Sequence, residues 1–458
     1  MKPSVTLRSA SLLLAAILLS ACSAVTPTMN QPLSEAGRVL PKQAGAEQAK
    51  DAVNSKSLSL ILTFSGGGTR AAAFSYGVMK GLRDTNYLRD GQSRSLLQEV
   101  DLISSVSGGS FTAAYYGLYG DDLFVNYERD FLRKPVQTHL LNDWLARPSN
   151  WFKLFPALYN RSDLAAEYYE QNIFQNKQFK DFRSDGPAIV INATDVSAGV
   201  PFSFTPENFE WICSNLSNYP VGRAVAASAA VPVLFSPITL RNYADCEITK
   251  PDVVNAGVSR NALQALDVRK YKNKKRYPFL HLLDGGIADN LGVRSVLHAV
   301  SEHGDNFWTL MQHYGIQDTE DVAFIIVNAA DDISPAIAQM QEEPPTDLVL
   351  AAVTTIQSSR YNTDTLDMLD YLFSIWEKQV ITGRCGTQQV KTCKTTRFHL
   401  VELNFKQLPQ QLSNQLSLTE TSLELPSEKV DQLIQAGEYV LKRSKPFSDL
   451  LRELSRPQ

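Results

Sequence analysis

Residues 58–68 read LSLILTFSGGG, a short apolar run that ends in a glycine turn. An apolar run of this length, bounded by such a turn, predicts a buried strand, and the residues from Thr69 onward have helical spacing. The same order recurs where the apolar residues 100–106 run into Ser107-Gly108-Gly109. Strands that alternate with helices in this way predict an α/β fold, in which a mostly parallel central sheet is flanked by helices on both faces.

The rest of the chain continues this pattern. Further strands are predicted at residues 188–193, 279–283, 322–328 and 398–405. The C-terminal part has two helical patterns, at 348–357 and 363–378, and a last helix for which Ser427 is the expected N-cap. Because neither a repeat nor a Gly/Pro-rich linker divides this region, we expect one domain over residues 56–458.

The composition excludes several classes of protein. The 458 residues are 44% hydrophobic and 20% charged, which allows a large core and excludes a disordered chain or a coiled coil. Lys and Arg number 44 and Asp and Glu 48, so the formal charge of −4 offers no overall basic surface for nucleic acid. The cysteines lack the spacing of a zinc site and no histidine cluster accompanies them, so we predict neither a metal nor another cofactor.

The N-terminus has the layout of a secretory signal. Basic residues precede the apolar residues 12–19 and small residues follow, which predicts a signal peptide at 1–21. Residues 19–22 read LSAC and resemble the lipobox of bacterial lipoproteins. That resemblance implies that Cys22 carries a lipid that anchors the protein to the cell envelope, at the outer membrane. Residues 22–55 lack a sustained apolar period, so we expect them to include a flexible tether.

Four further cysteines remain: Cys213, Cys246, Cys385 and Cys393. An even number fits disulfides in an oxidising compartment. Cys385 and Cys393 lie close enough in sequence to staple one loop, which leaves Cys213 and Cys246 for a second bridge. The sequence alone does not establish this pairing.

Two other segments have more than one interpretation. Residues 121–177 form an insertion rich in aromatic side chains, among them Trp144, Trp151, Phe152 and Phe155. The insertion is compatible with a cap over an apolar substrate channel, with a segment that dips into a membrane interface, or with a pair of helices packed on the sheet. The basic residues 270–276 are most simply a solvated loop, with contact to anionic lipid headgroups as the alternative.

Ser107 lies at the turn from an apolar strand into a helix, where an enzyme exposes a nucleophilic serine above its sheet. The N-terminus of the following helix directs donors at negative charge. Gly108 and Gly109 are small, as the close approach of strand and helix requires, but Ser105 stands where the G-x-S-x-G motif has its first glycine. The alternative role for Ser107 is a plain helix N-cap.

A glycine run upstream favours the catalytic interpretation. Attack on an ester creates an oxyanion, which needs preorganised donors about 3 Å away. Gly66, Gly67 and Gly68 follow a strand and can present successive amides without side-chain obstruction. The run lacks the endings of a P-loop and of a dinucleotide-binding loop, so a phosphate site is the weaker interpretation. Arg70, just beyond, either braces this loop or adds positive charge.

The serine needs a base, and Asp284 is the candidate. Asp284-Gly285-Gly286 follows a predicted strand, which places a carboxylate at the strand end beside glycines that leave room for a neighbour. An Asx turn is the structural alternative for Asp-Gly. His281 lies an odd number of residues earlier on the same strand and should face the other side of the sheet. The sequence therefore predicts a Ser-Asp pair.

These motifs, in this order, resemble the patatin-like phospholipases. Secondary matches lie at residues 192–195, 227–232, 235–237 and 289–292, and the similarity extends over about 58–441. The resemblance implies a patatin-like fold in which Ser107 is the nucleophile, Asp284 the base and Gly66–Gly68 the oxyanion hole, without histidine or calcium. It assigns supporting roles to Arg70, Gly108, Gly109, Gly285 and Gly286.

The resemblance also implies the reaction. The expected activity is that of a serine acyl hydrolase, a phospholipase that cleaves acyl esters of membrane lipids or lysolipids. Two alternatives stay open: an acyltransferase that uses the same acyl-enzyme, and a non-catalytic lipoprotein that binds lipid or another protein. The headgroup, the chain length and the oligomeric state do not follow from the sequence.

Overall fold

The structure is a computed structural model that describes residues 30–33, 57–89, 92–146, 159–232, 234–243, 246, 260–330, 336–386 and 393–455. The predicted signal peptide and Cys22 lie outside these residues. Part of the expected tether does not behave as a tether: strand β1 (Gln31–Pro32) pairs with β8 (Ser214–Asn215). The adjacent Asn30 is buried because its side-chain amide nitrogen donates to Ser214 Oγ at 2.9 Å and to the Arg241 carbonyl oxygen at 2.8 Å.

The central sheet confirms the predicted fold class. Its eight strands are β2 (Leu58–Phe64), β5 (Val100–Val106), β6 (Ala188–Asp195), β7 (Val200–Ser203), β9 (Ile238–Arg241), β10 (Phe279–Asp284), β11 (Asp321–Asn328) and β12 (Arg397–Asn404). The order is β12-β11-β2-β5-β6-β10-β9, and β7 pairs with β6. The strands from β12 to β6 run parallel, whereas β10 is antiparallel to both of its neighbours.

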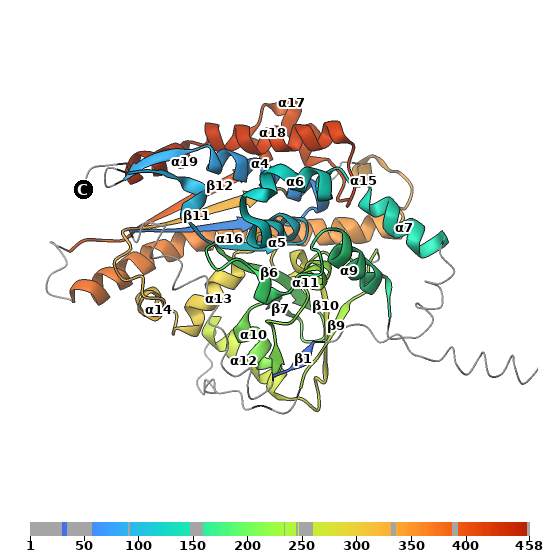
Figure 1. Cartoon of the computed structure of the whole chain (residues 1–458), viewed down its shortest axis with the longest axis horizontal. Helices are drawn as coiled ribbons and strands as arrows, with labels where there is room; N and C mark the ends of the chain where they lie inside the picture. Colours follow the sequence, from blue (N-terminus) through green and yellow to red (C-terminus); the bar gives the residue numbers. More distant parts are fainter. Residues whose placement is uncertain are drawn as a thin grey trace, which may run out of the picture.

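Helices cover both faces of this sheet, as Figure 1 shows. One face carries α4 (Gly68–Arg83), α5 (Gly108–Tyr119) and α18 (Ser427–Arg443), and the other carries α13 (Arg294–Glu302), α14 (Phe307–His313) and α16 (Thr346–Cys385). Successive side chains of a strand point to opposite faces. Leu60 and Leu62 accordingly belong to one buried apolar cluster and Ile61 to the other. The chain thus forms three layers around a two-sided core.

The C-terminal helices differ from the sequence prediction in two respects. The two helices expected at 348–357 and 363–378 are one 40-residue helix, α16, because the polar residues between them contain no glycine or proline to break it. Ser427 is the first residue of α18 and Pro426 is its N-cap. That helix is also not the last one, since α19 (Lys445–Leu454) follows it.

The described part of the aromatic insertion packs on the α5 face of the core. It contains α6 (Leu123–Tyr127), a π-helical turn (Glu128–Leu132), α7 (Val136–Ala146) and α9 (Arg161–Asn172). Phe131 stacks on Phe111 with 4.2 Å between ring centroids, and Tyr169 meets the same ring edge-on. Residues 147–158, which include Trp151, Phe152 and Phe155, lie outside the described residues, as does the side chain of Trp144.

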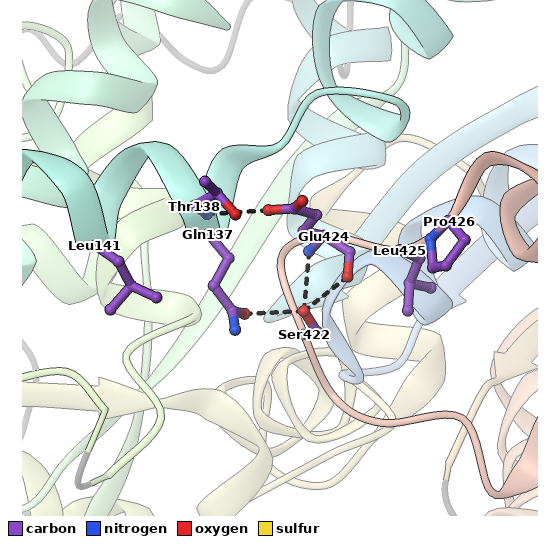
Figure 2. Close-up of a pocket in the computed structure, with 7 residues that line it drawn as sticks. All are labelled: Gln137, Thr138, Leu141, Ser422, Glu424, Leu425 and Pro426. Atoms are coloured by element: carbon purple, nitrogen blue, oxygen red, sulfur yellow. Dashed lines mark hydrogen bonds between the residues drawn. The ribbon is translucent and has the colours of Figure 1, made fainter.

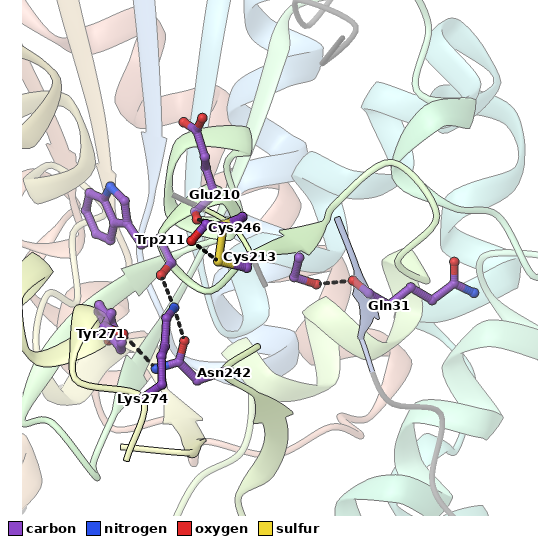
Figure 3. Close-up of a disulfide and its surroundings, with 9 residues drawn as sticks. Gln31, Glu210, Trp211, Cys213, Asn242, Cys246, Tyr271 and Lys274 are labelled. Atoms are coloured by element: carbon purple, nitrogen blue, oxygen red, sulfur yellow. Dashed lines mark hydrogen bonds between the residues drawn. A yellow bond between two sulfur atoms is a disulfide. The ribbon is translucent and has the colours of Figure 1, made fainter. Parts of the chain in front are cut away.

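The basic segment 270–276 is not a solvated loop throughout. Its start belongs to α12 (Arg260–Lys272), where Tyr271 is buried. Lys274 Nζ donates to the Trp211 carbonyl oxygen at 2.8 Å and to Asn242 Oδ1 at 2.6 Å, and partial burial lowers the pKa of this lysine to about 8. Figure 3 shows these contacts beside the Cys213–Cys246 disulfide. The second disulfide joins Cys385 and Cys393. Within the described ranges, no helix combines the length and the apolar character needed to span a bilayer.

Candidate active site

Ser107 occupies a sharp turn between β5 and α5. Its φ of 49° and ψ of −120° are unusual for a residue other than glycine, as at a strained nucleophile elbow. The neighbouring glycines are required sterically, because a Cβ at Gly108 would lie 1.9 Å from the Gly68 carbonyl oxygen and one at Gly109 would lie 2.6 Å from Phe64 Cβ. The starts of α4 and α5 therefore meet backbone to backbone beside Ser107.

The sheet register brings Asp284 to the same place. Asn192 on β6 lies opposite Val106, and Ala193 lies opposite Asp284, the last residue of β10. Because β10 is antiparallel, it ends level with the elbow. Ser107 Oγ donates a hydrogen bond of 2.7 Å to Asp284 Oδ2. The register thus joins two residues that are far apart in sequence.

The second carboxylate oxygen of Asp284 also has a donor. The amide of Gly286 donates to Asp284 Oδ1 at 2.8 Å. Burial of the carboxylate raises its pKa from 3.8 to about 6, although the hydrogen bonds from Ser107 and Gly286 act in the opposite direction. A carboxylate with this pKa is a stronger base than a solvent-exposed aspartate, and it is still ionised at neutral pH.

The glycine run lies alongside this pair. A Cβ at Gly66 would lie 3.2 Å from Ser107 Cβ, so the loop passes directly by the serine. Gly67 and Gly68 have φ values of 136° and 56°, which glycine adopts without strain. The Gly66 amide donates to the Asn290 carbonyl oxygen at 3.1 Å, whereas no hydrogen-bond acceptor for the amides of Gly67 and Gly68 is found among the described residues. These two amides are available to a bound group.

Arg70 holds the glycine loop in place. It is fully buried, and its Nε donates to the Ala329 carbonyl oxygen at 3.0 Å while its guanidinium also donates to the Thr419 carbonyl oxygen. Burial lowers the pKa of this arginine to about 9. These contacts favour the bracing role over a role as a charge presented to a substrate, because they tie the loop to the end of β11 and to the C-terminal segment.

Ser105 does not obstruct the elbow. Its hydroxyl donates to the Val190 carbonyl oxygen on β6 at 3.0 Å, and the residue is fully buried. The extra hydroxymethyl group is therefore accommodated inside the sheet, with its polar atom paired. This departure from the usual glycine leaves the Ser107–Asp284 geometry intact.

The structure shows a network of polar residues around the elbow to which the sequence analysis assigned no role. Ser228 Oγ accepts from the Ser107 amide at 2.8 Å and donates to the Asn192 carbonyl oxygen at 2.6 Å. Thr194 Oγ1 donates to the Asp284 carbonyl oxygen at 2.9 Å. Asn192, Thr194 and Ser228 lie in segments that match the family pattern. That match was the sequence signal from which their role could have been inferred. Their polar side chains fix the backbone on which the two candidate catalytic residues stand.

A cavity of about 340 Å³ lies next to the glycine loop, between α7 and the segment 422–426, and Figure 2 shows its lining. The Ser422 carbonyl oxygen accepts from the Thr69 amide at 2.8 Å, and Ser422 Oγ donates to Gln137 Oε1 at 2.9 Å. The C-terminal segment thus connects the loop to the insertion.

His281 is not a hydrogen-bond partner of the Ser107–Asp284 pair in the described residues. His281 is exposed and its Nδ1 lies 3.1 Å from Thr239 Oγ1. No group of three or more His, Cys, Asp or Glu side chains in the described residues is placed to hold a metal ion.

Comparison with known proteins places the chain in a family, although the similar solved structures share little sequence identity with it. No curated protein matches this chain. Among solved structures, human GIVD cytosolic phospholipase A2 is similar at 12% identity and a TM-score of 0.44, with 90% of this chain and 65% of that chain covered. The same human enzyme with methyl gamma-linolenyl fluorophosphonate inhibitor and terbium chloride gives 14% identity and a TM-score of 0.41, with 90% and 62% covered.

VipD from Legionella pneumophila matches at 10% identity and a TM-score of 0.28, with 96% of this chain and 72% of that chain covered. The match to human GIVD cytosolic phospholipase A2 spans about 65% of the length of that enzyme. The family model described as patatin-like phospholipase matches residues 62–297, which is just over half of the chain. The chain therefore belongs to the patatin-like phospholipase family.

Proposed function

We propose that this protein is a serine acyl hydrolase that cleaves acyl esters of phospholipids or related membrane lipids. The observation that carries the proposal is the 2.7 Å hydrogen bond from Ser107 Oγ to Asp284 Oδ2 at a strained elbow. Membership of the patatin-like phospholipase family supports a lipid ester as the substrate.

The proposed reaction begins with acylation. Asp284 accepts the Ser107 proton while Oγ attacks the ester carbonyl carbon. The glycine loop holds the oxyanion, with the Gly67 and Gly68 amides as donors and Gly66 as the residue that keeps the loop beside the serine. The amide of Gly108, the residue after the nucleophile and the first of α5, is a further donor. Protonated Asp284 then returns its proton to the leaving alkoxide.

Deacylation uses the same groups in reverse. Asp284 takes a proton from water as the water oxygen attacks the acyl-enzyme carbonyl carbon. Collapse of the second tetrahedral intermediate breaks the bond to Ser107 Oγ, releases the fatty acid and returns the proton to the serine. A pKa of about 6, raised by burial, suits Asp284 to both proton transfers near neutral pH.

The proposal extends to the setting of the reaction. Lipidation at Cys22 and the cell-envelope location stay predictions from the lipobox resemblance. Metabolic labelling with tritiated palmitate tests them, since a Cys22→Ser variant of the full-length protein should lose a label that the wild type carries. Label retained by that variant would contradict the anchor.

Substitution of the two candidate catalytic residues tests the reaction. Ser107→Ala and Asp284→Asn should each lower kcat by at least about 1,000-fold, as nucleophile and base removal does in serine hydrolases. Ser374→Ala and Asp370→Asn, both at exposed positions on α16, are matched controls that should retain wild-type activity. The readout is fatty-acid release from phospholipid in mixed micelles, with circular dichroism to verify folding. Near-wild-type turnover by the folded Ser107→Ala variant would contradict the proposal.

A further inference from the structure

A second cavity, of about 370 Å³, lies where β11 and β12 end. Its polar lining includes Asn328 at the end of β11, Glu402 and Asn404 on β12, Lys406 just beyond, and Asn362 and Asp367 on α16. Because β12, β11, β2 and β5 are parallel, the cavity lies along the same sheet edge as Ser107. Ligands of α/β folds bind at this carboxyl edge.

One lining residue has an unmet hydrogen-bonding requirement. Asn362 is only 5% exposed, and its side-chain nitrogen has no acceptor among the described residues. Buried donors in folded proteins are rarely left without a partner, because the lost hydration is not replaced. An acceptor supplied by a ligand would satisfy this amide.

The charges of the cavity are also incompletely paired. Glu402 Oε1 accepts from Asn328 Nδ2 at 2.9 Å, but within the described residues neither Glu402 nor Asp367 forms an ion pair. Lys406 contributes the cationic side chain of the lining, and it too has no carboxylate partner within the described ranges. Two carboxylates and one ammonium group thus face a shared space, a pattern that is complementary to a ligand with an ammonium and an anionic group.

The cavity borders both loops of the candidate active site. Ala329, between the lining residues Asn328 and Ala330, contacts the glycine loop: its carbonyl oxygen accepts from Arg70 and would lie 3.4 Å from a Cβ at Gly67. On α16, Ser358 precedes the lining residue Ser359, and its Oγ donates to the Gly286 carbonyl oxygen at 3.0 Å. Strands β11 and β5 are two strand spacings apart, about 10 Å. A lipid whose headgroup occupies the cavity would have to extend over about 10 Å along this edge for its ester to meet Ser107.

We propose that this cavity binds the headgroup of the substrate lipid, and that the headgroup is a phosphate ester of a primary amine, as in phosphatidylethanolamine. The inference rests on the proposed hydrolase function. The primary ammonium donates hydrogen bonds to Asp367 and Glu402, and the phosphate accepts from Lys406 and Asn362. A purely anionic headgroup would place its charge against two carboxylates, so it binds less well.

Headgroup selectivity tests this assignment. We expect kcat/KM for phosphatidylethanolamine to exceed that for phosphatidylglycerol with the same acyl chains by at least about 10-fold, at equal surface concentration in detergent micelles. Asp367→Asn should lower kcat/KM for phosphatidylethanolamine by about 10-fold, because it removes one charged acceptor of the ammonium group. The same variant should raise kcat/KM for phosphatidylglycerol, because it removes a carboxylate that opposes the anionic headgroup. p-Nitrophenyl butyrate lacks a headgroup and reports the ester-cleaving step separately. Asp370→Asn, another exposed acid on α16 that is not part of the lining, is the control and should alter none of the three rates.

The outcomes separate the two proposals. Equal hydrolysis of both phospholipids by the wild type, or an equal fall for both in Asp367→Asn, would overturn the headgroup assignment and leave the hydrolase standing. Absence of hydrolysis with all three substrates would overturn the hydrolase itself, and the headgroup assignment with it. A selective loss for phosphatidylethanolamine supports both.

Discussion

The Ser107–Asp284 centre and the cavity at the ends of β11 and β12 lie on one sheet edge, but they differ in how their polar atoms are satisfied. At the centre, the Ser107 amide, its hydroxyl and both Asp284 carboxylate oxygens have partners within 2.8 Å. In the cavity, a buried asparagine nitrogen has no partner among the described residues. The hydrogen bonds at the centre hold the two candidate catalytic side chains in place, whereas the loop amides of Gly67 and Gly68 beside them lack an acceptor among the described residues.

The largest expected effect is the loss of stability when a methyl group is added at Gly108, beside Ser107. Gly108→Ala would place a Cβ 1.9 Å from the Gly68 carbonyl oxygen, so backbone must move. We expect the free energy of unfolding to fall by about 3 kcal/mol or more, with activity lost in the remaining folded protein. Gly186→Ala is the control, since its added Cβ would lie 3.7 Å from Arg183 Cβ, and the cost should stay within about 0.5 kcal/mol. Equal stability of both variants would contradict the close packing of the α4 and α5 backbones beside Ser107.

The pH dependence of catalysis comes next in size. The base must be ionised, and burial raises the pKa of Asp284 to about 6. We therefore expect kcat/KM for p-nitrophenyl butyrate to be constant above this pH and to fall about 10-fold per pH unit below it. Initial rates between pH 4.5 and 8.5 measure this profile. A rate that stays flat down to pH 4.5 would show that no buried carboxylate of this kind acts as base.

Burial of the same carboxylate should reduce stability. Because the folded pKa of about 6 exceeds the unfolded value of 3.8, the wild type loses stability as the pH rises through this interval. Asp284→Asn removes the charge, so at pH 7.5 it should raise the free energy of unfolding by about 1–3 kcal/mol. Urea unfolding at pH 7.5 and 4.5 should show a gain that shrinks at the lower pH. A variant less stable than the wild type at pH 7.5 would contradict this reasoning.

The smallest effect belongs to the cavity. Asn362→Leu replaces a buried amide that lacks an acceptor by an apolar side chain, so we expect a gain of about 1 kcal/mol in the free energy of unfolding. The same variant should lose part of the preference for phosphatidylethanolamine. A destabilised Asn362→Leu protein with unchanged selectivity would mean that Asn362 serves the fold alone. The contrast between the paired Ser107 and Asp284 side chains and the unpaired Asn362 amide would then say nothing about ligand binding.

Local sequence signals were sufficient for the strands and loops that carry the candidate catalytic residues, but not for the short strands β7 and β9 of the same sheet. The strands β2, β5 and β10 follow from apolar runs, and the turns that follow them carry Gly66, Ser107 and Asp284. The pairing of Ser107 with Asp284 depends on the antiparallel register of β10, which no local pattern encodes. The structure supplies that register, and it places the two side chains in hydrogen-bond contact.

Other features depend on tertiary contacts and could not be inferred from local patterns. Residues 358–362 lay between two helices expected from the sequence, yet α16 is continuous there, and its apolar residues Leu369, Phe373 and Trp376 pack on the sheet. Lys274 was predicted to lie in a solvated loop. Its hydrogen-bond partners, the Trp211 carbonyl and the Asn242 side chain, lie far away in sequence and could not be inferred from the local pattern. The cavity at the ends of β11 and β12 is likewise lined by residues from distant parts of the chain, between 328 and 417, so no sequence motif predicts it.

Covalent labelling tests the central claim most directly. A fluorophosphonate probe reacts with an activated serine and not with a helix-capping one. We predict that the folded wild-type protein is labelled once, that mass mapping assigns the adduct to Ser107, and that Ser107→Ala abolishes it. Labelling that persists in Ser107→Ala, or its absence from the folded wild type, would contradict the assignment of Ser107 as the nucleophile.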